Sequence, residues 1–494
     1  MSGVRRHVAI DLGASGGRVI DVTVSVGSIK TRVLHRFTNA PVATSRAGGL
    51  KLCWPFERLF AEILVGLRRA AEGGAVDSIG IDSWAVDYAL LDEHGELVRP
   101  IAAYRDARTQ EPFSRLRSQI GDELIYRTTG IAFQPFNTLY QLAADAADPS
   151  RPFERTQRML MLPDYVAFRL CGAILCEGTN ASSTQMLDAR TGTWSVELAR
   201  AAGVPARALP EIVEAGTRLG AITAEIADLT GLDPSTPVIA TATHDTASAV
   251  VAAPIDPAHD IYVSSGTWSL VGTELRHAVT SDAARRANIT NEHGAFGTVR
   301  MLRNVAGLWL VQQLEAAFEA EGHARTWAEL AALAAAAEPL KSVVNPDDPA
   351  LFEPGDMPAR MRAACSARGE PVPDDDGALV RCALDSIALA TAHAAREIAA
   401  ISDLAVRRIV VVGGGAANEL LDQLIADASG LPVETGPTEC TAIGNALVQY
   451  AALERLTDAE PLRSIVRTSF PCRRFEPDSA AYAGMQAAMA RARR

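Results

Sequence analysis

The chain has 494 residues, more than the roughly 250–300 that one hydrophobic core usually supports, so two large domains are expected. Hydrophobic residues make up 48% and charged residues 21% of the sequence, a balance that excludes extensive disorder. The formal net charge is −12 and basic residues cluster only in the final ARARR, so nucleic acid is not an expected partner.

No stretch reaches the roughly 18 uninterrupted apolar residues of a membrane span, and Asp11 interrupts the first apolar run too early for a signal peptide. We therefore expect a cytoplasmic protein with no membrane partner. The seven cysteines include no CxxC pair that would indicate zinc. Whether Cys365 and Cys382 meet is left open, and a reducing cytosol disfavours a disulfide between them.

Two segments predict the same strand–turn–strand plan. Residues 7–24 (HVAIDLGASGGRVIDVTV) place a Gly/Ser turn between two apolar strands, and residues 260–275 (DIYVSSGTWSLVGTEL) repeat this plan later in the chain. The backbone NH groups of such turns can hold an anion. The repetition favours two related lobes, each beginning with a hairpin.

Strands alternate with helices in the rest of the chain, which is typical of an α/β protein with at least partly parallel sheets. The pattern predicts a buried strand in 75–92, helices in 113–146 around a turn at IAFQPFN, one helix over 304–320, and helices in 326–340 and 377–401. A strand, three glycines and an amphipathic helix ending at Gly430 follow in 407–430, and 432–453 adds a last short strand and helix.

The segment TATHDTASAVVAAP, residues 241–254, places His244 and Asp245 among small residues. A carboxylate in such surroundings is hydrogen-bonded, paired with a charge or engaged with a ligand. An N-cap role for Asp245, in front of a helix beginning at Thr246, explains it equally well. Because DPSTP and APIDPAHD flank the segment, we expect a lobe junction beyond that helix and the pair near an interlobe cleft, where ligand sites concentrate.

Three glycine-rich turns follow apolar strands, at residues 13–17, 264–267 and 413–415. Each one alone can simply provide the positive φ of a tight turn, and none has P-loop or complete GxGxxG spacing. In the first turn, Asp11 ends the strand, and a carboxylate there can orient hydrated Mg²⁺. Arg18 follows the glycines, where it either contacts phosphate oxygens or lies in solvent.

These segments, in this order, resemble the FGGY carbohydrate kinases of the sugar kinase, Hsp70 and actin superfamily. DLGASGGR is similar to the first phosphate motif, SSGTWSL to the second, and VVGGGAANELLDQLIAD to the adenosine motif. Further segments match one group of ketose kinases in the family: IDSWAVDYALLD, AYRDART, TGIAFQPFNTLYQL, LMLPDYVAFRL, THDTASAV, ANITNE and NVAGLWLVQ. The resemblance extends from His7 to Leu453.

The resemblance implies an α/β fold with two ribonuclease H-like (actin-like ATPase) domains around a central cleft. The expected division is a sugar-binding lobe in 1–250, an ATP-binding lobe in 251–455 and a tail of unassigned role in 456–494. The implied reaction is transfer of the ATP γ-phosphoryl group, with Mg²⁺, to the 1-hydroxyl of L-rhamnulose, as in rhamnose catabolism. The oligomeric state, monomer or weak homodimer, is left open.

The resemblance also implies roles for single residues. Asp245 is the expected catalytic base and Asp11 the expected Mg²⁺ ligand. The residues expected to contact ATP are Ala14, Ser15, Gly16, Gly17, Arg18, Thr267, Gln312 and Gly414, and those expected to contact the sugar are Ala85, His244, Asp245, Thr246 and Asn304. Asn304 and Gln312 are expected on one helix, a little over two turns apart.

One position departs from the family pattern. Where the similar kinases usually have DTWGVDF, this chain has DSWAVDY, so the methyl group of Ala85 replaces a glycine expected to approach the sugar. The preferred sugar can then be a related ketose such as L-fuculose, L-ribulose or D-xylulose. Asp82 is expected either at Mg²⁺ or the sugar, or in a structural salt bridge, and Arg105 either pairs with a carboxylate across the cleft or serves structurally. Trp84 and Trp268 are expected in the core.

Two other functions remain as alternatives. A catalytically silent sugar sensor on the same fold is disfavoured because it needs neither the base Asp245 nor three glycine turns. An Hsp70-like ATPase would need a peptide-binding domain or a dedicated partner surface, and the segment after Ala451 is too short for such a domain.

Overall fold

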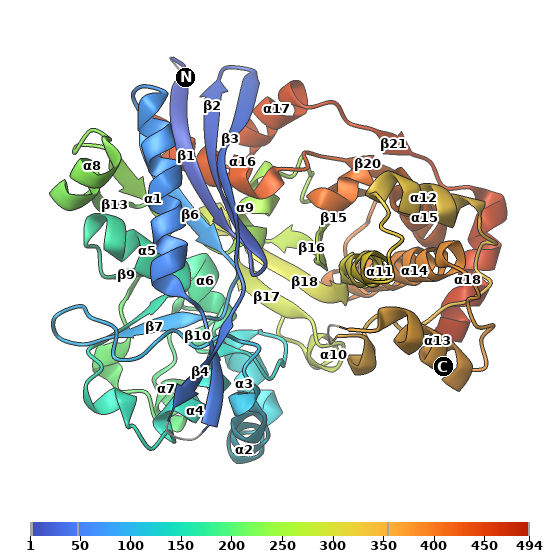
Figure 1. Cartoon of the computed structure of the whole chain (residues 1–494), viewed down its shortest axis with the longest axis horizontal. Helices are drawn as coiled ribbons and strands as arrows, with labels where there is room; N and C mark the ends of the chain where they lie inside the picture. The colour runs from blue at the N-terminus through green and yellow to red at the C-terminus, as the bar shows by residue number, and fades with distance from the viewer. Residues whose placement is uncertain (1–2, 47–48, 353–354, 493–494) are drawn as a thin grey trace. The chain divides into compact units, whose positions relative to one another are not determined.

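The computed structural model describes residues 3–46, 49–352 and 355–492 (Figure 1). The chain forms two compact units. The first contains Met1–Ala252, Glu274–Met301 and Cys440–Ser469, and the second contains Ala253–Thr273, Leu302–Glu439 and Phe470–Arg494. Strands and helices alternate in both units, so the predicted α/β class is confirmed.

These units are discontinuous in sequence, whereas the sequence suggested contiguous lobes. The chain returns to the first unit because α16 (Cys440–Glu454) packs tightly on α9 (Asp245–Ala252). A Cβ atom on Gly444 would lie only 1.7 Å from the Ser248 carbonyl oxygen, so the two helix backbones are nearly in contact.

The last part of the chain is also divided between the units. α17 (Glu460–Ser469) belongs to the first unit, while β21 (Arg474–Phe475) and α18 (Ser479–Ala492) belong to the second. The segment after residue 455 is therefore structurally part of both units rather than one separate tail.

The main sheet of the first unit has the strand order β13-β14-β6-β1-β2-β3. Its strands are β1 (Arg5–Leu12), β2 (Gly16–Ser25), β3 (Ser28–Thr38), β6 (Ser78–Ser83), β13 (Arg218–Ala221) and β14 (Pro237–Ile239). β1 pairs antiparallel with β2, which confirms the first predicted hairpin. β1 also pairs parallel with β6, and β6 parallel with β14, so the carboxyl ends of these three strands meet at one edge.

The helix α1 (Phe56–Glu72) covers this sheet with an apolar face that includes Leu59, Ile63 and Leu67 (Figure 1). Gly66 permits the close approach, because a Cβ atom there would lie 2.4 Å from the Val19 side chain. The other helices of the first unit are α2 (Gln110–Ile120), α3 (Asp122–Thr129), α4 (Thr138–Ala146), α5 (Leu162–Cys171), α6 (Gly178–Ser183), α7 (Val196–Ala201), α8 (Ala224–Thr230) and α10 (Asp282–Arg286).

Short strands complete the first unit. They are β4 (Val42–Arg46), β5 (Gly49–Cys53), β7 (Tyr88–Leu91), β8 (Arg158–Met161), β9 (Leu175–Glu177), β10 (Leu187–Asp188), β11 (Thr193–Trp194), β12 (Glu211–Val213) and β17 (Thr290–His293). The predicted strand in 75–92 is thus two strands, β6 and β7, and the predicted helices in 113–146 are confirmed as α2, α3 and α4.

In the second unit the strands are ordered β18-β16-β15-β19-β20-β21, where β16 belongs to this unit up to Thr273 and β18 from Leu302 onward. Their bounds are β15 (Asp260–Ser265), β16 (Trp268–Leu275), β18 (Val299–Ala306), β19 (Arg408–Val412) and β20 (Val433–Thr435), and the helices are α11 (Trp309–Ala320), α12 (Trp327–Ala336), α13 (Met357–Ala367), α14 (Asp376–Ser402) and α15 (Glu419–Ser429). The second predicted hairpin is confirmed as β15 and β16. The predicted end of α15 is also confirmed, since Gly430 caps it with φ 73°.

The prediction of one helix over 304–320 is wrong, because Asn304 lies in β18 and the helix α11 begins at Trp309. Gly307 separates the two elements at a point of very close packing. A Cβ atom there would lie 2.7 Å from the Gly266 carbonyl oxygen and 2.8 Å from the Ser269 nitrogen. The tight contact with the β15–β16 turn ends the strand before the helix can begin.

Among the described residues, one helix, α14, is long and apolar enough to cross a membrane, but 83% of its most apolar window is buried inside the protein. Its position among α12, α15 and α18 identifies it as a core helix. Cys382 of α14 and Cys365 of α13 are both free thiols, with 4.0 Å between their sulfur atoms.

Substitution of Gly444 by alanine tests the α9–α16 contact. We expect Gly444→Ala to lower the free energy of unfolding by at least about 2 kcal/mol, because the new methyl group overlaps backbone that cannot move away. Gly484→Ala in the middle of α18 is the matched control. Its Cβ meets nothing closer than 3.5 Å, so it should stabilise by about 0.5–1 kcal/mol through helix propensity. Denaturant unfolding of both variants measures the difference, and equal stability would contradict it.

Candidate functional site

Three carboxylates gather at the carboxyl ends of the parallel strands in the first unit. Asp11 near the end of β1 pairs in register with Asp82 of β6. The segment after β14 continues alongside β6, where the Ser83 nitrogen donates to the Thr243 carbonyl oxygen at 2.9 Å, and it leads directly to Asp245 at the start of α9. The sheet topology thus brings together residues that are far apart in sequence.

The first glycine turn connects Asp11 to Arg18, and these two residues form an ion pair across the β1–β2 hairpin. Arg18 is therefore not simply a solvated strand residue. Gly16 and Gly17 are required by packing as well, because Cβ atoms there would lie 2.9 Å and 2.3 Å from atoms of Phe37. The predicted ATP contacts of residues 14–18 are all on this turn and strand.

Asp82 is completely buried, and burial raises its pKa well above the usual range, with the nearby Asp11 charge adding to the effect. Its Oδ2 atom accepts a hydrogen bond of 2.6 Å from the Asn445 amide of α16. Its Oδ1 atom has no hydrogen-bond partner among the described residues. The sequence left open a structural salt bridge for Asp82, but the side-chain partner of Asp82 in the described residues is the neutral Asn445 amide.

A directional hydrogen-bond chain holds that amide in place. Ser78 donates to Gln449 at 2.7 Å, Gln449 donates to Asn445 at 2.7 Å, and Asn445 donates to Asp82. Because the Ser78 hydroxyl already donates, it accepts from His7 Nδ1 at 2.8 Å, so His7 is the neutral Nδ1–H tautomer. Burial lowers the pKa of His7 to about 4, which agrees with a neutral ring.

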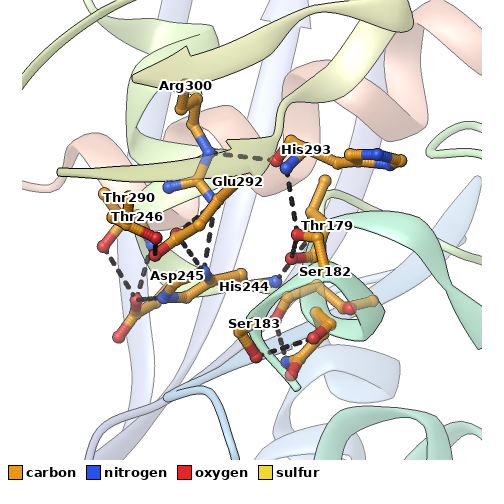
Figure 2. Close-up of polar contacts among 12 residues, drawn as sticks. Thr179, Ser182, Ser183, His244, Asp245, Thr246, Thr290, Glu292, His293 and Arg300 are labelled. Atoms are coloured by element: carbon orange, nitrogen blue, oxygen red, sulfur yellow. Dashed lines mark hydrogen bonds and ion pairs between the residues drawn. The ribbon is translucent and has the colours of Figure 1, made fainter. Parts of the chain in front are cut away.

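Asp245 is the first residue of α9, and its two carboxylate oxygens differ (Figure 2). Oδ1 accepts from the Thr246 nitrogen at 2.6 Å and from the Thr246 hydroxyl at 3.1 Å, and it lies 3.5 Å from His244 Nε2. The side chain remains 34% exposed. Desolvation by the surrounding protein raises the pKa of Asp245, and the Asp11 charge adds to this, whereas His244 acts in the opposite direction.

The His244 ring lies between Asp245 and a buried ion pair of Glu292 and Arg300 (Figure 2). Its Nδ1 atom is 3.2 Å from Glu292 Oε2 and 3.1 Å from Arg300 Nη2. Although burial disfavours the charged carboxylate, Arg300 and His244 lower the pKa of Glu292 to about 2. Sequence reasoning assigned no role to either residue, and its one available signal was the ANITNE segment, which ends at Glu292.

A second buried carboxylate holds the backbone that leads to Asp245. Glu177 accepts hydrogen bonds from the nitrogen and hydroxyl of Thr179 and from those of Thr243, the latter two at 3.0 Å and 2.8 Å. Burial raises the pKa of Glu177. The Thr179 hydroxyl also accepts from the His244 nitrogen at 3.1 Å, which fixes the residue before Asp245.

Ala85 lies in the loop between β6 and β7 and is partly exposed. The backbone strain in this loop is at the next residue, because Val86 has φ 71°, which a β-branched side chain rarely adopts. The Val86 carbonyl oxygen accepts from the Thr138 hydroxyl at 2.7 Å and from the Gln141 amide at 3.1 Å. These contacts hold the strained conformation.

The indole of Trp84 is buried, as predicted, and packs on Trp54 with ring centroids 4.4 Å apart. Both indole nitrogens donate to Asp87 Oδ2, at 2.9 Å and 2.6 Å. Burial raises the pKa of Asp87 to about 6. Arg105 lies near Tyr104, whose hydroxyl accepts from its Nε atom at 3.1 Å.

The second unit contains the other two glycine turns. Gly413 has φ 83°, and a Cβ atom on Gly415 would lie 2.0 Å from the Ser265 hydroxyl, so these two turns pack directly on each other. Gly414, between Gly413 and Gly415 in the sequence, borders open space, because a Cβ atom built on it would have no neighbouring atom within 4 Å. Thr267 donates to Gln312 at 3.2 Å, so these two predicted ATP contacts are adjacent.

Two sequence expectations in this unit differ from the structure. Asn304 is on β18 rather than on the helix of Gln312, as described above. Trp268, the first residue of β16, is not a core aromatic, since its side chain is 37% exposed. Its ring packs on that of Phe352, with ring centroids 5.5 Å apart.

Comparison with known proteins identifies the family. The N-terminal domain of the FGGY family of carbohydrate kinases matches residues 7–252, and the C-terminal domain of this family matches residues 261–453. The chain therefore belongs to the FGGY family of carbohydrate kinases, which confirms the resemblance seen in the sequence. It is a sugar kinase with ATP as co-substrate.

Two curated relatives and two solved structures illustrate the similarity. The chain is 40% identical to the rhamnulokinase of Pectobacterium carotovorum subsp. carotovorum over 477 residues, 96% of this chain and 93% of the relative, and 39% identical to that of Klebsiella pneumoniae strain 342 over 478 residues, 96% and 95% of the two chains. Ligand-bound xylulose kinase from Lactobacillus acidophilus has a TM-score of 0.80 at 16% identity, covering 99% and 97% of the chains. Glycerol kinase of Plasmodium falciparum with ADP has a TM-score of 0.79 at 14% identity, with the same coverage. At these identities the structures support the fold alone, the actin-like ATPase fold that the sequence predicted.

Asp422 of α15, just after the third glycine turn, is a buried carboxyl group whose two oxygens have no hydrogen-bond partner among the described residues. Burial raises its pKa to about 8. An unfolded aspartate has a pKa of about 3.9, so between about pH 4 and pH 8 the folded state binds more protons than the unfolded state. This group therefore makes the protein less stable as the pH rises through that window.

We expect Asp422→Asn to raise the free energy of unfolding by about 2–4 kcal/mol at pH 8 and to change it little at pH 4, because the amide cannot ionise. Asp427→Asn on the same helix is the control. That carboxylate accepts from Gln423 and from the Asp478 nitrogen, so its replacement should give no such gain. Thermal unfolding from pH 4 to pH 9 measures both, and a pH-independent effect of Asp422→Asn would contradict the assignment.

Proposed function

We propose that this FGGY kinase phosphorylates L-rhamnulose at the 1-hydroxyl to give L-rhamnulose 1-phosphate and ADP, as a cytoplasmic rhamnulokinase. The observation that carries this proposal is the 38–40% identity to curated rhamnulokinases over 95–96% of the chain. L-Fuculose, L-ribulose and D-xylulose are the alternative acceptors, because the resemblance implies a glycine where this chain has Ala85.

In the proposed reaction, Asp245 accepts the proton of the attacking hydroxyl. Its position is suited to this role, because its carboxylate is partly exposed at the carboxyl edge of the sheet and has an elevated pKa. Phosphoryl transfer depends mainly on positioning and charge stabilisation, so one oriented carboxylate is sufficient as base. His244, Thr246, Ala85 and Asn304 are the proposed sugar contacts.

The proposed phosphate contacts are on the first glycine turn. The backbone of Ala14, Ser15, Gly16 and Gly17 follows a strand end, where amide groups can cradle an anion, and Arg18 adds a positive charge. Thr267, Gln312 and Gly414 are the proposed contacts to the rest of ATP. The open space at Gly414 and the hydrogen bond between Thr267 and Gln312 support this assignment.

Asp11 is the proposed residue for Mg²⁺. Among the described residues, no group of three or more His, Cys, Asp or Glu side chains is arranged to hold a metal ion alone. Mg²⁺ bound with ATP keeps several waters and needs only one or two carboxylates, so Asp11 beside the unpartnered Oδ1 of Asp82 fits such an ion. When bound, Mg²⁺ would neutralise charge on the transferred phosphoryl group.

A coupled ADP-release assay with L-rhamnulose, L-fuculose, L-ribulose, D-xylulose and glycerol tests the proposal. We expect the highest kcat/KM for L-rhamnulose, and a fall in kcat of about 10²–10⁴-fold in Asp245→Asn, because the amide cannot accept a proton. Preference for another ketose would refute the substrate assignment but not the family. Sugar binding without ADP release would favour the sensor alternative.

Ala85→Gly tests whether the Ala85 methyl group narrows the sugar pocket. One methyl group in a pocket typically changes discrimination by about 1–3 kcal/mol, so we expect KM for L-rhamnulose to change about tenfold while KM for ATP stays constant. Ala189→Gly, at a partly buried loop alanine, is the matched control and should leave both constants unchanged. Steady-state kinetics measure both variants, and an unchanged KM in Ala85→Gly would place the methyl group outside the pocket.

A further inference from the structure

The two oxygens of Asp245 have unequal surroundings (Figure 2). Among the described residues, the contacts of the carboxylate are on the Oδ1 side: the Thr246 nitrogen and hydroxyl donate to Oδ1 at 2.6 Å and 3.1 Å, and His244 Nε2 lies 3.5 Å from the same oxygen. An oxygen engaged by several donors is a weaker base than its neighbour. The arrangement therefore leaves Oδ2 as the more basic oxygen.

The opposite nitrogen of His244 faces both a donor and an acceptor. Arg300 Nη2, at 3.1 Å, can only donate, and Glu292 Oε2, at 3.2 Å, can only accept. A neutral ring that accepts from Arg300 at Nδ1 carries its hydrogen on Nε2, and a protonated ring donates from Nδ1 to Glu292 while keeping the Nε2 hydrogen. The other neutral tautomer would donate from Nδ1 to Glu292 and leave Nε2 without a hydrogen. The Asp245 carboxylate disfavours that last tautomer, because the bare Nε2 lone pair would face a negatively charged oxygen, so the favoured states keep the Nε2 hydrogen on the side of Asp245.

The pair that faces Nδ1 is itself rigidly held. Arg300 has no exposed side-chain surface, and it donates to Glu292 at 2.9 Å and to the His293 carbonyl oxygen at 3.1 Å. The His293 nitrogen donates to the Ser182 hydroxyl at 2.9 Å. Because Glu292 and Arg300 carry opposite charges, the pair fixes His244 without adding net charge beside Asp245.

Other charged or titratable groups also face Asp245 from neighbouring elements. Asp11 of β1 and Asp82 of β6 act on it electrostatically, as does Tyr104 from the loop after β7. Unlike these groups, His244 places a ring nitrogen 3.5 Å from the Asp245 carboxylate. Its orientation consequently affects both the pKa of Asp245 and which oxygen is available.

We propose that Glu292 and Arg300 are positioning residues for the phosphoryl transfer: they hold His244 so that Nε2–H engages Asp245 Oδ1 and the substrate proton goes to Oδ2. This inference rests on the proposed function, since it takes Asp245 as the base. In the step itself, the sugar O–H bond breaks as its oxygen bonds to the γ-phosphorus. The proton goes to Oδ2, and ADP leaves with the electron pair of the broken phosphoanhydride bond.

The double variant Glu292→Met/Arg300→Met tests this role. It removes both partners of His244 Nδ1 while preserving net charge and approximate volume, a replacement that buried ion pairs often tolerate. We expect the acidic limb of the kcat/KM profile to move to higher pH by about 0.5–1 unit, because Asp245 loses a donor that favours its charged form. We also expect kcat to fall about 10–100-fold from misplacement of the base, with KM for ATP unchanged.

Glu274→Met/Arg463→Met is the matched control, because Glu274 and Arg463 form a comparably buried ion pair in the same unit without contacting His244. Both double variants are expected to change the unfolding temperature, but only the first should change the pH profile. A folded Glu292→Met/Arg300→Met enzyme with the wild-type pH limb and kcat would overturn the proposal.

Should that variant not fold, Glu292→Asp carries the same test, since it withdraws the carboxylate by one methylene while keeping its charge. We expect the acidic limb to shift in the same direction, and an unshifted limb would again overturn the proposal. Failure of the proposed function is recognised separately, because Asp245→Asn would then retain the wild-type rate whatever the Glu292 variants do.

Discussion

A nearby negative charge raises the pKa of a carboxyl group, and at the ends of neighbouring parallel strands in the first unit Asp11 acts in this way on both Asp82 and Asp245, while Asp245 also acts on Asp82. Each has a different compensation: Arg18 pairs with Asp11, an amide from α16 donates to Asp82, and Thr246 donates to Asp245. These three compensations explain why the flanking hairpin, the returning helix α16 and the start of α9 must all meet at this edge. The returning helix also explains why the unit is discontinuous in sequence.

Local features of the fold were predictable from the sequence. Both hairpins and the strand–glycine–helix segment at 407–430 combine strong apolar periodicity with turn residues. They can therefore be predicted from local sequence, without knowledge of contacts between distant residues. The sequence pattern also singled out Asp245, a lone carboxylate among small residues, whose role stays a prediction. The one-helix prediction for 304–320 was wrong because close packing at Gly307, which periodicity does not register, separates Asn304 from the helix.

The support for Asp245 was beyond sequence reasoning because it is built from distant segments. Glu177, Glu292 and Arg300 are ordinary charged residues by pattern, and only the tertiary structure shows that they are buried and aligned on His244 and its backbone. Likewise, the hydrogen bond from Asn445 to Asp82 joins residues that are 363 positions apart in the sequence. Single-sequence patterns indicate which residues are unusual, whereas these partners become visible only through packing.

A structure of the enzyme with L-rhamnulose and a non-hydrolysable ATP analogue tests the central claim most directly. The account predicts that the sugar 1-hydroxyl oxygen lies within about 2.6–3.2 Å of Asp245 Oδ2, while Oδ1 keeps its contacts with Thr246. A 1-hydroxyl hydrogen-bonded to Oδ1, or to a different side chain altogether, would contradict it.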